Sequence, residues 1–146
     1  MFKRIAIATT LLITCFLVVV IFRPSFYEKR QLQLGGGSIA YKVAGEGETV
    51  VLLHGFASMD YLWELTGLFG RLANDFRVVS YDARGHGDSL KPANSDSFGM
   101  YMVSDLAALL DQLGIEKAYL VGHSMGGLTA LKFASMYPER ALGVVS

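Results

Sequence analysis

The run Gly122-His123-Ser124-Met125-Gly126 is the clearest indication of how this chain folds, because of the segments on either side of it. It follows Lys117–Val121 (KAYLV), which is short and apolar, as a buried strand is. It precedes residues 125–137, which have the composition of a helix that Pro138 stops. A G-x-S-x-G run between a strand and a helix is typical of a nucleophile elbow, a sharp turn that raises a serine hydroxyl above a sheet edge.

The spacing of the glycines fits that turn. Backbone passes close to the positions two before and two after the serine, and Gly122 and Gly126 have no side chain to clash there. The N–H of Met125 would lie in the first turn of the following helix, where unpaired donors and the dipole favour a developing oxyanion. The alternative is that Ser124 is an ordinary helix N-cap after a tight glycine turn.

Strand-like and helix-like segments alternate outward from this motif. The sequence predicts strands at 30–34, 39–44, 49–53, 76–81, 117–121 and 141–146, and helices at 61–72, 103–113 and 125–137. The first two strands flank Gly35-Gly36-Gly37-Ser38 as a hairpin. The later order predicts an α/β fold, a mostly parallel sheet with helices on both faces. The final strand has no helix after it, so we expect a domain truncated after the start of its sixth strand.

Two further motifs stand directly after predicted strands. His54-Gly55-Phe56 follows strand 49–53, and Asp82-Ala83-Arg84-Gly85-His86-Gly87-Asp88-Ser89 follows strand 76–81. Together with the Ser124 run, these motifs make residues 30–146 resemble the N-terminal part of the α/β-hydrolase superfamily. The resemblance is to its serine esterase and lipase-like, C–C hydrolase and haloperoxidase-like branches.

This resemblance implies a role for each matching position. Ser124 matches the nucleophile, and Phe56 and Met125 match the residues whose backbone N–H groups form the oxyanion hole. The positions that shape these two turns are His54, Gly55, Gly122 and Gly126. The Asp82–Ser89 stretch resembles the family's structural turn, with Arg84 and Asp88 in polar contacts, although a solvated turn fits equally well.

The residue type at the elbow predicts the kind of substrate. Members of this superfamily that open epoxides or remove halides carry Asp there, whereas a serine suits acyl transfer. We therefore expect a carboxylic ester or a related acyl substrate, and no cofactor or metal. Nearby apolar side chains favour an apolar small-molecule substrate, although most of them fit core or rim packing as well: Phe56, Met59, Tyr61, Trp63 and Met125.

Two alternatives to an esterase remain open. One is a non-catalytic protein that keeps the fold for binding; the other is a C–C bond hydrolase or perhydrolase with the same triad. The family's triad runs Ser, then Asp or Glu, then His. After Ser124 the chain has no histidine, no aspartate and one acid, Glu139. We expect the triad acid and histidine past Ser146, and residues 1–146 alone to be inactive.

The N-terminus predicts a membrane-inserting leader, residues 1–22. Ile5 to Phe22 carries no charge and would form a helix of about 27 Å, close to the thickness of a bilayer core. No small-x-small cleavage site follows, so we expect a signal anchor or uncleaved signal peptide. Residues 23–29 are then a linker. We expect membrane anchoring through residues 5–22, with the domain on the extracytoplasmic side, or secretion if the leader is cleaved.

Charge and cysteine content exclude some function classes. All 13 Asp and Glu, and all but Lys3 and Arg4 of the 13 Lys and Arg, follow residue 22. The remaining domain is slightly acidic and has no basic cluster, so it lacks the electrostatic footprint of a nucleic-acid-binding protein. Cys15 is the single cysteine, so the chain has neither a disulfide framework nor a cysteine metal site.

Overall fold

The computed structural model describes residues 25–146. The leader predicted at residues 1–22 therefore lies outside the described residues. The strands are β1 (Arg30–Leu34), β2 (Gly37–Ala44), β3 (Thr49–Leu53), β4 (Arg77–Tyr81), β5 (Ala118–Gly122) and β6 (Ala141–Val145). The helices are α2 (Tyr61–Leu65), α3 (Leu68–Leu72), α4 (Met100–Gln112) and α5 (Met125–Met136), with short 3-10 turns η1 (Ser95–Ser97) and η2 (Pro138–Arg140).

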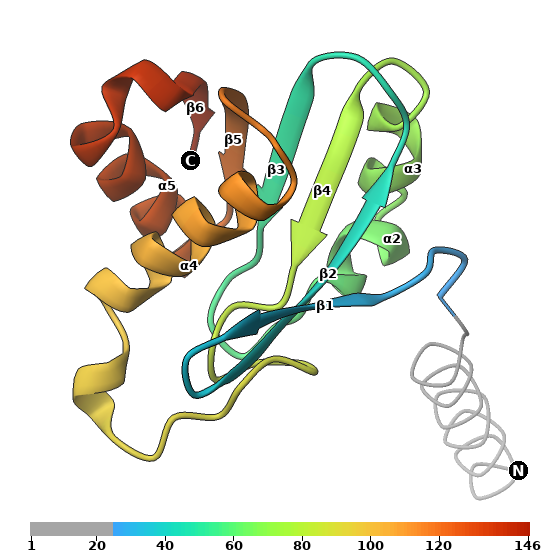
Figure 1. The fold of residues 1–146 in the computed structure, drawn as a ribbon. Coiled ribbons are helices and arrows are strands. Elements are labelled where there is room, and N and C mark those ends of the chain that lie inside the picture. The colour runs from blue at the N-terminus through green and yellow to red at the C-terminus, as the bar shows by residue number, and fades with distance from the viewer. Residues whose placement is uncertain (1–24) are drawn as a thin grey trace, which may run out of the picture.

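The strands form one sheet in the order β1-β2-β4-β3-β5-β6 (Figure 1). β1 pairs antiparallel with β2, and β2 pairs antiparallel with β4. The pairs β3–β4, β3–β5 and β5–β6 are parallel. The predicted α/β fold with a hairpin and a mostly parallel sheet is confirmed.

Helices cover both faces of the sheet, as expected (Figure 1). Successive residues of β3 point to opposite faces, and all five are buried. On one face Val51 and Leu53 pack in a core that includes Leu106 of α4 and Phe133 of α5. On the other face a smaller core joins β3 and β4 to α2 and α3 through Val50, Leu52, Val78, Trp63 and Phe69.

The helix predicted at 61–72 is divided into α2 and α3. Gly67 separates them with a φ of 73°, in the left-handed region that glycine adopts without a steric cost. The apolar spacing across residues 61–72 is therefore that of two short helices on the same side of the sheet. Periodicity alone could not show the break, because the pattern continues across it.

The register of the sheet brings three loops to one edge. Leu53, the last residue of β3, lies beside Tyr81 of β4 and Gly122 of β5. The chain leaves all three strands at their carboxyl ends, so the loops that begin at His54, Asp82 and His123 meet there. Ligand sites of open α/β sheets occur at this edge. Among residues 25–146, no helix has the length and hydropathy needed to cross a bilayer.

Candidate active site

Ser124 occupies a strained turn between β5 and α5. Its φ of 52° and ψ of −113° are unusual for any residue other than glycine, and such conformations cost about 1–3 kcal/mol. Ser124 stands at the N-cap position, yet its side chain makes no capping hydrogen bond. The residue is exposed. Helix capping, the ordinary reason for a serine at this position, therefore does not account for Ser124.

The glycines on either side of Ser124 lie where the backbone leaves no room for a side chain. A Cβ atom on Gly122 would overlap the carbonyl group of Gly126, and a Cβ atom on Gly126 would overlap the carbonyl group of Leu53. The same turn is held by a hydrogen bond from the Gly126 N–H to the His123 carbonyl oxygen, 2.9 Å. Both glycines are thus steric requirements of the turn.

The loop after β3 supplies the second predicted oxyanion position. Phe56 is 77% exposed, and the next residue, Ala57, has a φ of 55°. The Ala57 N–H donates to Nε2 of His86 at 3.3 Å, and the rings of Phe56 and His86 meet edge to face at 5.5 Å. Met125 is the first residue of α5, and N–H groups in a first turn have no acceptor within their helix.

Two of the three histidines have both ring nitrogens engaged by backbone. Nε2 of the buried His54 accepts the Ala83 N–H at 2.9 Å, so Nδ1–H donates to the Gly55 carbonyl oxygen at 2.7 Å. Burial lowers the pKa of His54 and keeps its ring neutral. In His86 Nε2 accepts from Ala57, so Nδ1–H donates to the Arg84 carbonyl oxygen at 3.1 Å. Both rings therefore hold loops in place.

The Asp82–Ser89 turn is largely buried. Asp82 and Ser89 are 0% and 4% exposed, so the interpretation of this stretch as a solvated turn is wrong. Arg84 binds the Asp105 carboxylate through two nitrogens, at 2.7 and 2.6 Å, and thereby joins the turn to α4. Asp88 forms an ion pair with Lys29 at 2.8 Å. The polar contacts predicted for Arg84 and Asp88 are confirmed.

An open apolar pocket of about 560 Å³ lies beside the elbow. Both predicted oxyanion residues, Phe56 and Met125, line it, together with His86, Phe98, Met102, Val103, Leu128 and Thr129. Of the other apolar residues expected near the pocket mouth, Trp63 is instead buried in the smaller core. Met59 and Tyr61 do not line this pocket. An apolar group held in it would lie next to both backbone positions.

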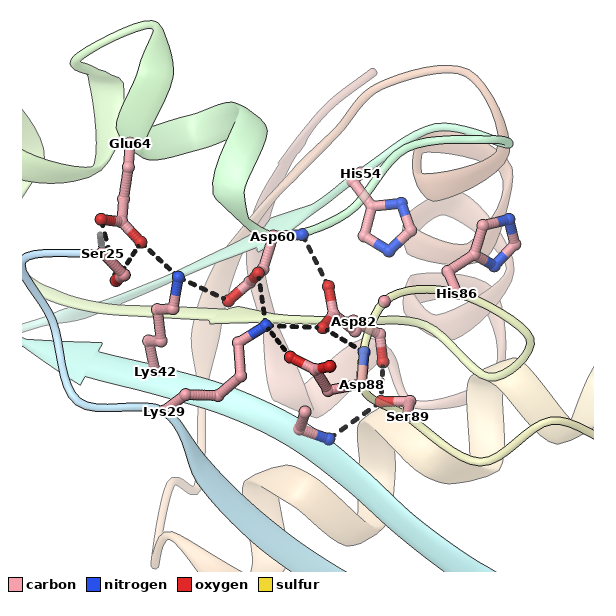
Figure 2. Close-up of polar contacts among 12 residues, drawn as sticks. Ser25, Lys29, Lys42, His54, Asp60, Glu64, Asp82, His86, Asp88 and Ser89 are labelled. Carbon is pink, nitrogen blue, oxygen red and sulfur yellow. Dashed lines mark hydrogen bonds and ion pairs between the residues drawn. The ribbon is translucent and has the colours of Figure 1, made fainter. Parts of the chain in front are cut away.

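Sequence reasoning missed a partly buried ion cluster next to the loop after β3 (Figure 2). Its members are Lys29, Lys42, Asp60, Glu64, Asp82 and Asp88. One signal was present: Lys42 interrupts the apolar strand residues of β2 and is 1% exposed. A lysine in such a strand indicates a buried acidic partner. The partners of Lys42 are Asp60 and Glu64, which are 18 and 22 residues away in the sequence, and only the fold brings them close.

The two buried aspartates of this cluster differ electrostatically. Burial and the neighbouring charge of Asp82 raise the pKa of Asp60. Burial also disfavours the Asp82 carboxylate, but backbone N–H donors from Asp60 and Asp88, together with Lys29, lower its pKa below the usual value. Burial opposes the charge of Lys29 as well, yet its hydrogen bonds to Asp88 and Asp82 raise its pKa. Asp82 is thus the anion around which the cluster is built.

Within residues 25–146, no group of His, Cys, Asp and Glu side chains is arranged to hold a metal ion.

The chain belongs to the α/β hydrolase fold family, whose model matches residues 48–146. Epoxide hydrolase 3 of Siraitia grosvenorii is 39% identical over 70% of this chain and 32% of its own length. Fluoroacetate dehalogenase of a Burkholderia species is 35% identical over 81% of this chain and 40% of its own. Among solved structures, Est816, described as an N-acyl homoserine lactone degrading enzyme, has a TM-score of 0.71 and 32% identity over 79% of this chain and 43% of its own. The chain thus spans about a third to two-fifths of the length of these relatives.

Proposed function

We propose that the protein is a serine hydrolase that acts on a carboxylic ester or a related acyl substrate, with Ser124 as its nucleophile. The observation that carries this proposal is the backbone of Ser124. Strain at a serine that makes no capping hydrogen bond, on a turn with steric space only for glycine at positions 122 and 126, is the geometry of a nucleophile elbow.

The chemistry follows from the groups around Ser124. Its hydroxyl oxygen attacks the substrate carbonyl carbon while a general base takes the hydroxyl proton. The carbonyl oxygen gains negative charge, which the backbone N–H groups of Phe56 and Met125 stabilise. The carbon–oxygen bond to the leaving group breaks as the proton is returned to that group, and water then releases the acyl group from Ser124. The adjoining apolar pocket accommodates the substrate's apolar part.

The relatives differ in the substrates that their names state, so the residue at the elbow is the better guide. Opening of an epoxide and displacement of a halide use a carboxylate that attacks carbon. Ser124 offers a hydroxyl instead, which suits addition to a carbonyl. The lactone-degrading neighbour acts on a cyclic ester, which belongs to the class proposed here. The name of epoxide hydrolase 3 states hydrolysis as its reaction, and this supports the more general part of the proposal, a hydrolase.

The general base is proposed to lie in a part of the protein other than residues 1–146. His54 and His86 hold backbone groups with both ring nitrogens. The His123 side chain packs against Gly55. A polypeptide of residues 1–146 is therefore expected to turn over esters no faster than oxyanion stabilisation alone permits.

The experiment that tests the proposed activity is a substrate panel with the complete protein. It contains p-nitrophenyl esters of increasing acyl length, a styrene-type epoxide, fluoroacetate and a dienol ketone. We expect turnover of the esters, with a preference for apolar acyl groups. Turnover of the epoxide or of fluoroacetate in place of the esters would contradict the proposed reaction, and cleavage of the dienol ketone in their place would favour C–C hydrolysis. No turnover of any compound, together with no reaction with a fluorophosphonate, would favour a binding protein.

We further propose that residues 5–22 anchor the protein in a membrane, with residues 30–146 on the extracytoplasmic side. The support is the uncharged apolar run, which matches a bilayer core in length when helical. Anchoring would hold the hydrolase domain at the membrane surface, where apolar esters partition.

A further inference from the structure

Around Lys29, the ion cluster connects three segments that are far apart in the sequence, and Lys42 of β2 and Glu64 of α2 adjoin them (Figure 2). Lys29 belongs to the segment before β1. Asp60 ends the loop that begins at His54 and carries Phe56, and Asp82 and Asp88 belong to the turn after β4. Whatever holds these segments together also limits the movement of the loop that carries Phe56.

Asp82 joins the two loops directly. Its Oδ1 atom accepts the Asp60 N–H at 2.8 Å, and its Oδ2 atom accepts the Asp88 N–H at 2.9 Å. Both bonds end on backbone, so they fix main-chain positions as well as side chains. The loop from His54 to Asp60 is thus attached at its far end to the Asp82 carboxylate.

Lys29 neutralises this arrangement from the N-terminal segment. Its Nζ atom lies 3.1 Å from Asp60, 2.9 Å from Asp82 and 2.8 Å from Asp88. Asp60 and Asp82 are fully buried. Neither Asp60 oxygen accepts a hydrogen bond of good geometry among the described residues, so this carboxylate depends on the charges of Lys29 and Lys42, each 3.1 Å away.

Loss of Lys29 would leave two buried carboxylates close together with one lysine, Lys42, against Asp60. Buried like charges repel strongly because little water screens them. The part of this arrangement that can move is the loop, since Asp82 follows directly from the central strand β4. Phe56 lies four residues before Asp60 on the same loop, and the backbone between them includes the strained positive φ of Ala57. We therefore expect a displacement of Asp60 to shift the N–H of Phe56.

We infer that Lys29 is a positioning residue for the oxyanion hole: through Asp60 and Asp82 it couples the N-terminal segment to the loop that carries Phe56. The expected effect on kcat rests on the proposed function. The coupling of Lys29 to the loop that carries Phe56 depends only on the fold. The segment between the leader and β1 is then part of the active-site scaffold rather than a passive linker.

The test uses the complete protein and compares Lys29→Met with Arg30→Met. Arg30 is the matched control, because its side chain is half exposed and its one ion pair among residues 25–146 is with Glu28 on the surface. Hydrogen–deuterium exchange is followed in peptides covering residues 54–60 and 82–89, with residues 118–122 as the sheet reference. Values of kcat and KM for a p-nitrophenyl ester are measured on the same samples.

For Lys29→Met we expect faster exchange in residues 54–60 and a fall in kcat of about 10- to 100-fold, with KM changed less. Complete loss of an oxyanion donor costs about 10²- to 10³-fold, and displacement costs part of that. Arg30→Met should match the wild type in both measurements, and Lys29→Arg should recover most of kcat because it keeps the charge. Equal exchange and kcat in Lys29→Met and Arg30→Met would overturn the coupling.

Two other outcomes are separated by the same measurements. If the wild type hydrolyses no ester but Lys29→Met still loosens residues 54–60, the proposed function fails and the coupling stands. If Lys29→Met loses protection in residues 118–122 as well, the double variant Lys29→Met, Asp60→Asn decides. It removes the charge of Asp60 together with that of Lys29, so the repulsion between the two buried carboxylates is gone. Recovery of slow exchange in residues 54–60 in the double variant supports the coupling, and exchange there as fast as in Lys29→Met overturns it.

Discussion

The backbone N–H of His123 donates a hydrogen bond of 2.9 Å to the carbonyl oxygen of Leu53. This bond joins the residue before Ser124 to the last residue of β3, from which the loop to Phe56 begins. The proposed nucleophile and the loop that carries one proposed oxyanion donor therefore begin from neighbouring strands of one sheet. The register of β3 and β5 sets where that loop starts relative to Ser124.

The first prediction concerns Gly126, whose missing side chain leaves room for the Leu53 carbonyl group. Gly126→Val should lower the free energy of unfolding by about 1–3 kcal/mol, because the added atoms overlap backbone that cannot move without breaking the β3–β5 register. Urea unfolding measures the loss. Gly35→Val is the control, since a Cβ atom there meets nothing within 4 Å. Equal stability of the two variants would contradict the steric account of the turn.

The second prediction concerns pH and His54. The unfolded chain protonates this ring near its ordinary pKa of 6.5, whereas burial lowers the pKa in the folded protein. Below pH 6.5 the unfolded state thus binds more protons, so stability falls as the pH decreases through that window. His54→Gln should weaken this dependence by up to about 1.4 kcal/mol per pH unit. The measurement is urea unfolding at pH 7.5 and pH 5.5. Parallel pH dependence in both proteins would show that His54 is not held neutral.

The third prediction compares two aspartates on α4. Asp105 is buried and binds Arg84 through two bonds, whereas Asp111 is 67% exposed and pairs with Arg140. Asp105→Ala should cost about 3–5 kcal/mol of stability, because it leaves a buried guanidinium unpaired. Asp111→Ala should cost less than about 1 kcal/mol. Similar thermal unfolding midpoints for the two variants would show that the Arg84–Asp105 pair does not hold the turn to α4.

The sequence predicted the fold well because its signals are local. A buried strand such as β3 is apolar at every position after Thr49, and Gly114 and Pro138 follow the helices they end. The division of the 61–72 helix at Gly67 was missed, since glycine is compatible with either outcome. The ion cluster was missed for a different reason. Lys29, Asp60 and Asp82 have no common spacing, and their segments come together only through the pairing of β1 with β2, β2 with β4 and β3 with β4.

The fourth prediction concerns the leader. The complete protein should sediment with membranes, resist extraction by high salt and be released by detergent, because residues 5–22 provide an apolar span of bilayer length. A variant that starts at Pro24 should remain in the supernatant. Recovery of the complete protein as a soluble, shortened chain would indicate cleavage and secretion instead of anchoring.

The assignment of Ser124 as nucleophile is tested by the reaction of the complete protein with a fluorophosphonate, followed by mass spectrometry of the peptide that contains Ser124. We predict a single adduct on Ser124. We also predict that Ser124→Ala abolishes both labelling and ester turnover, with a loss on the order of 10⁴-fold or more. Ester turnover that survives in Ser124→Ala, or an adduct on a different serine, would contradict the assignment of Ser124 as the nucleophile.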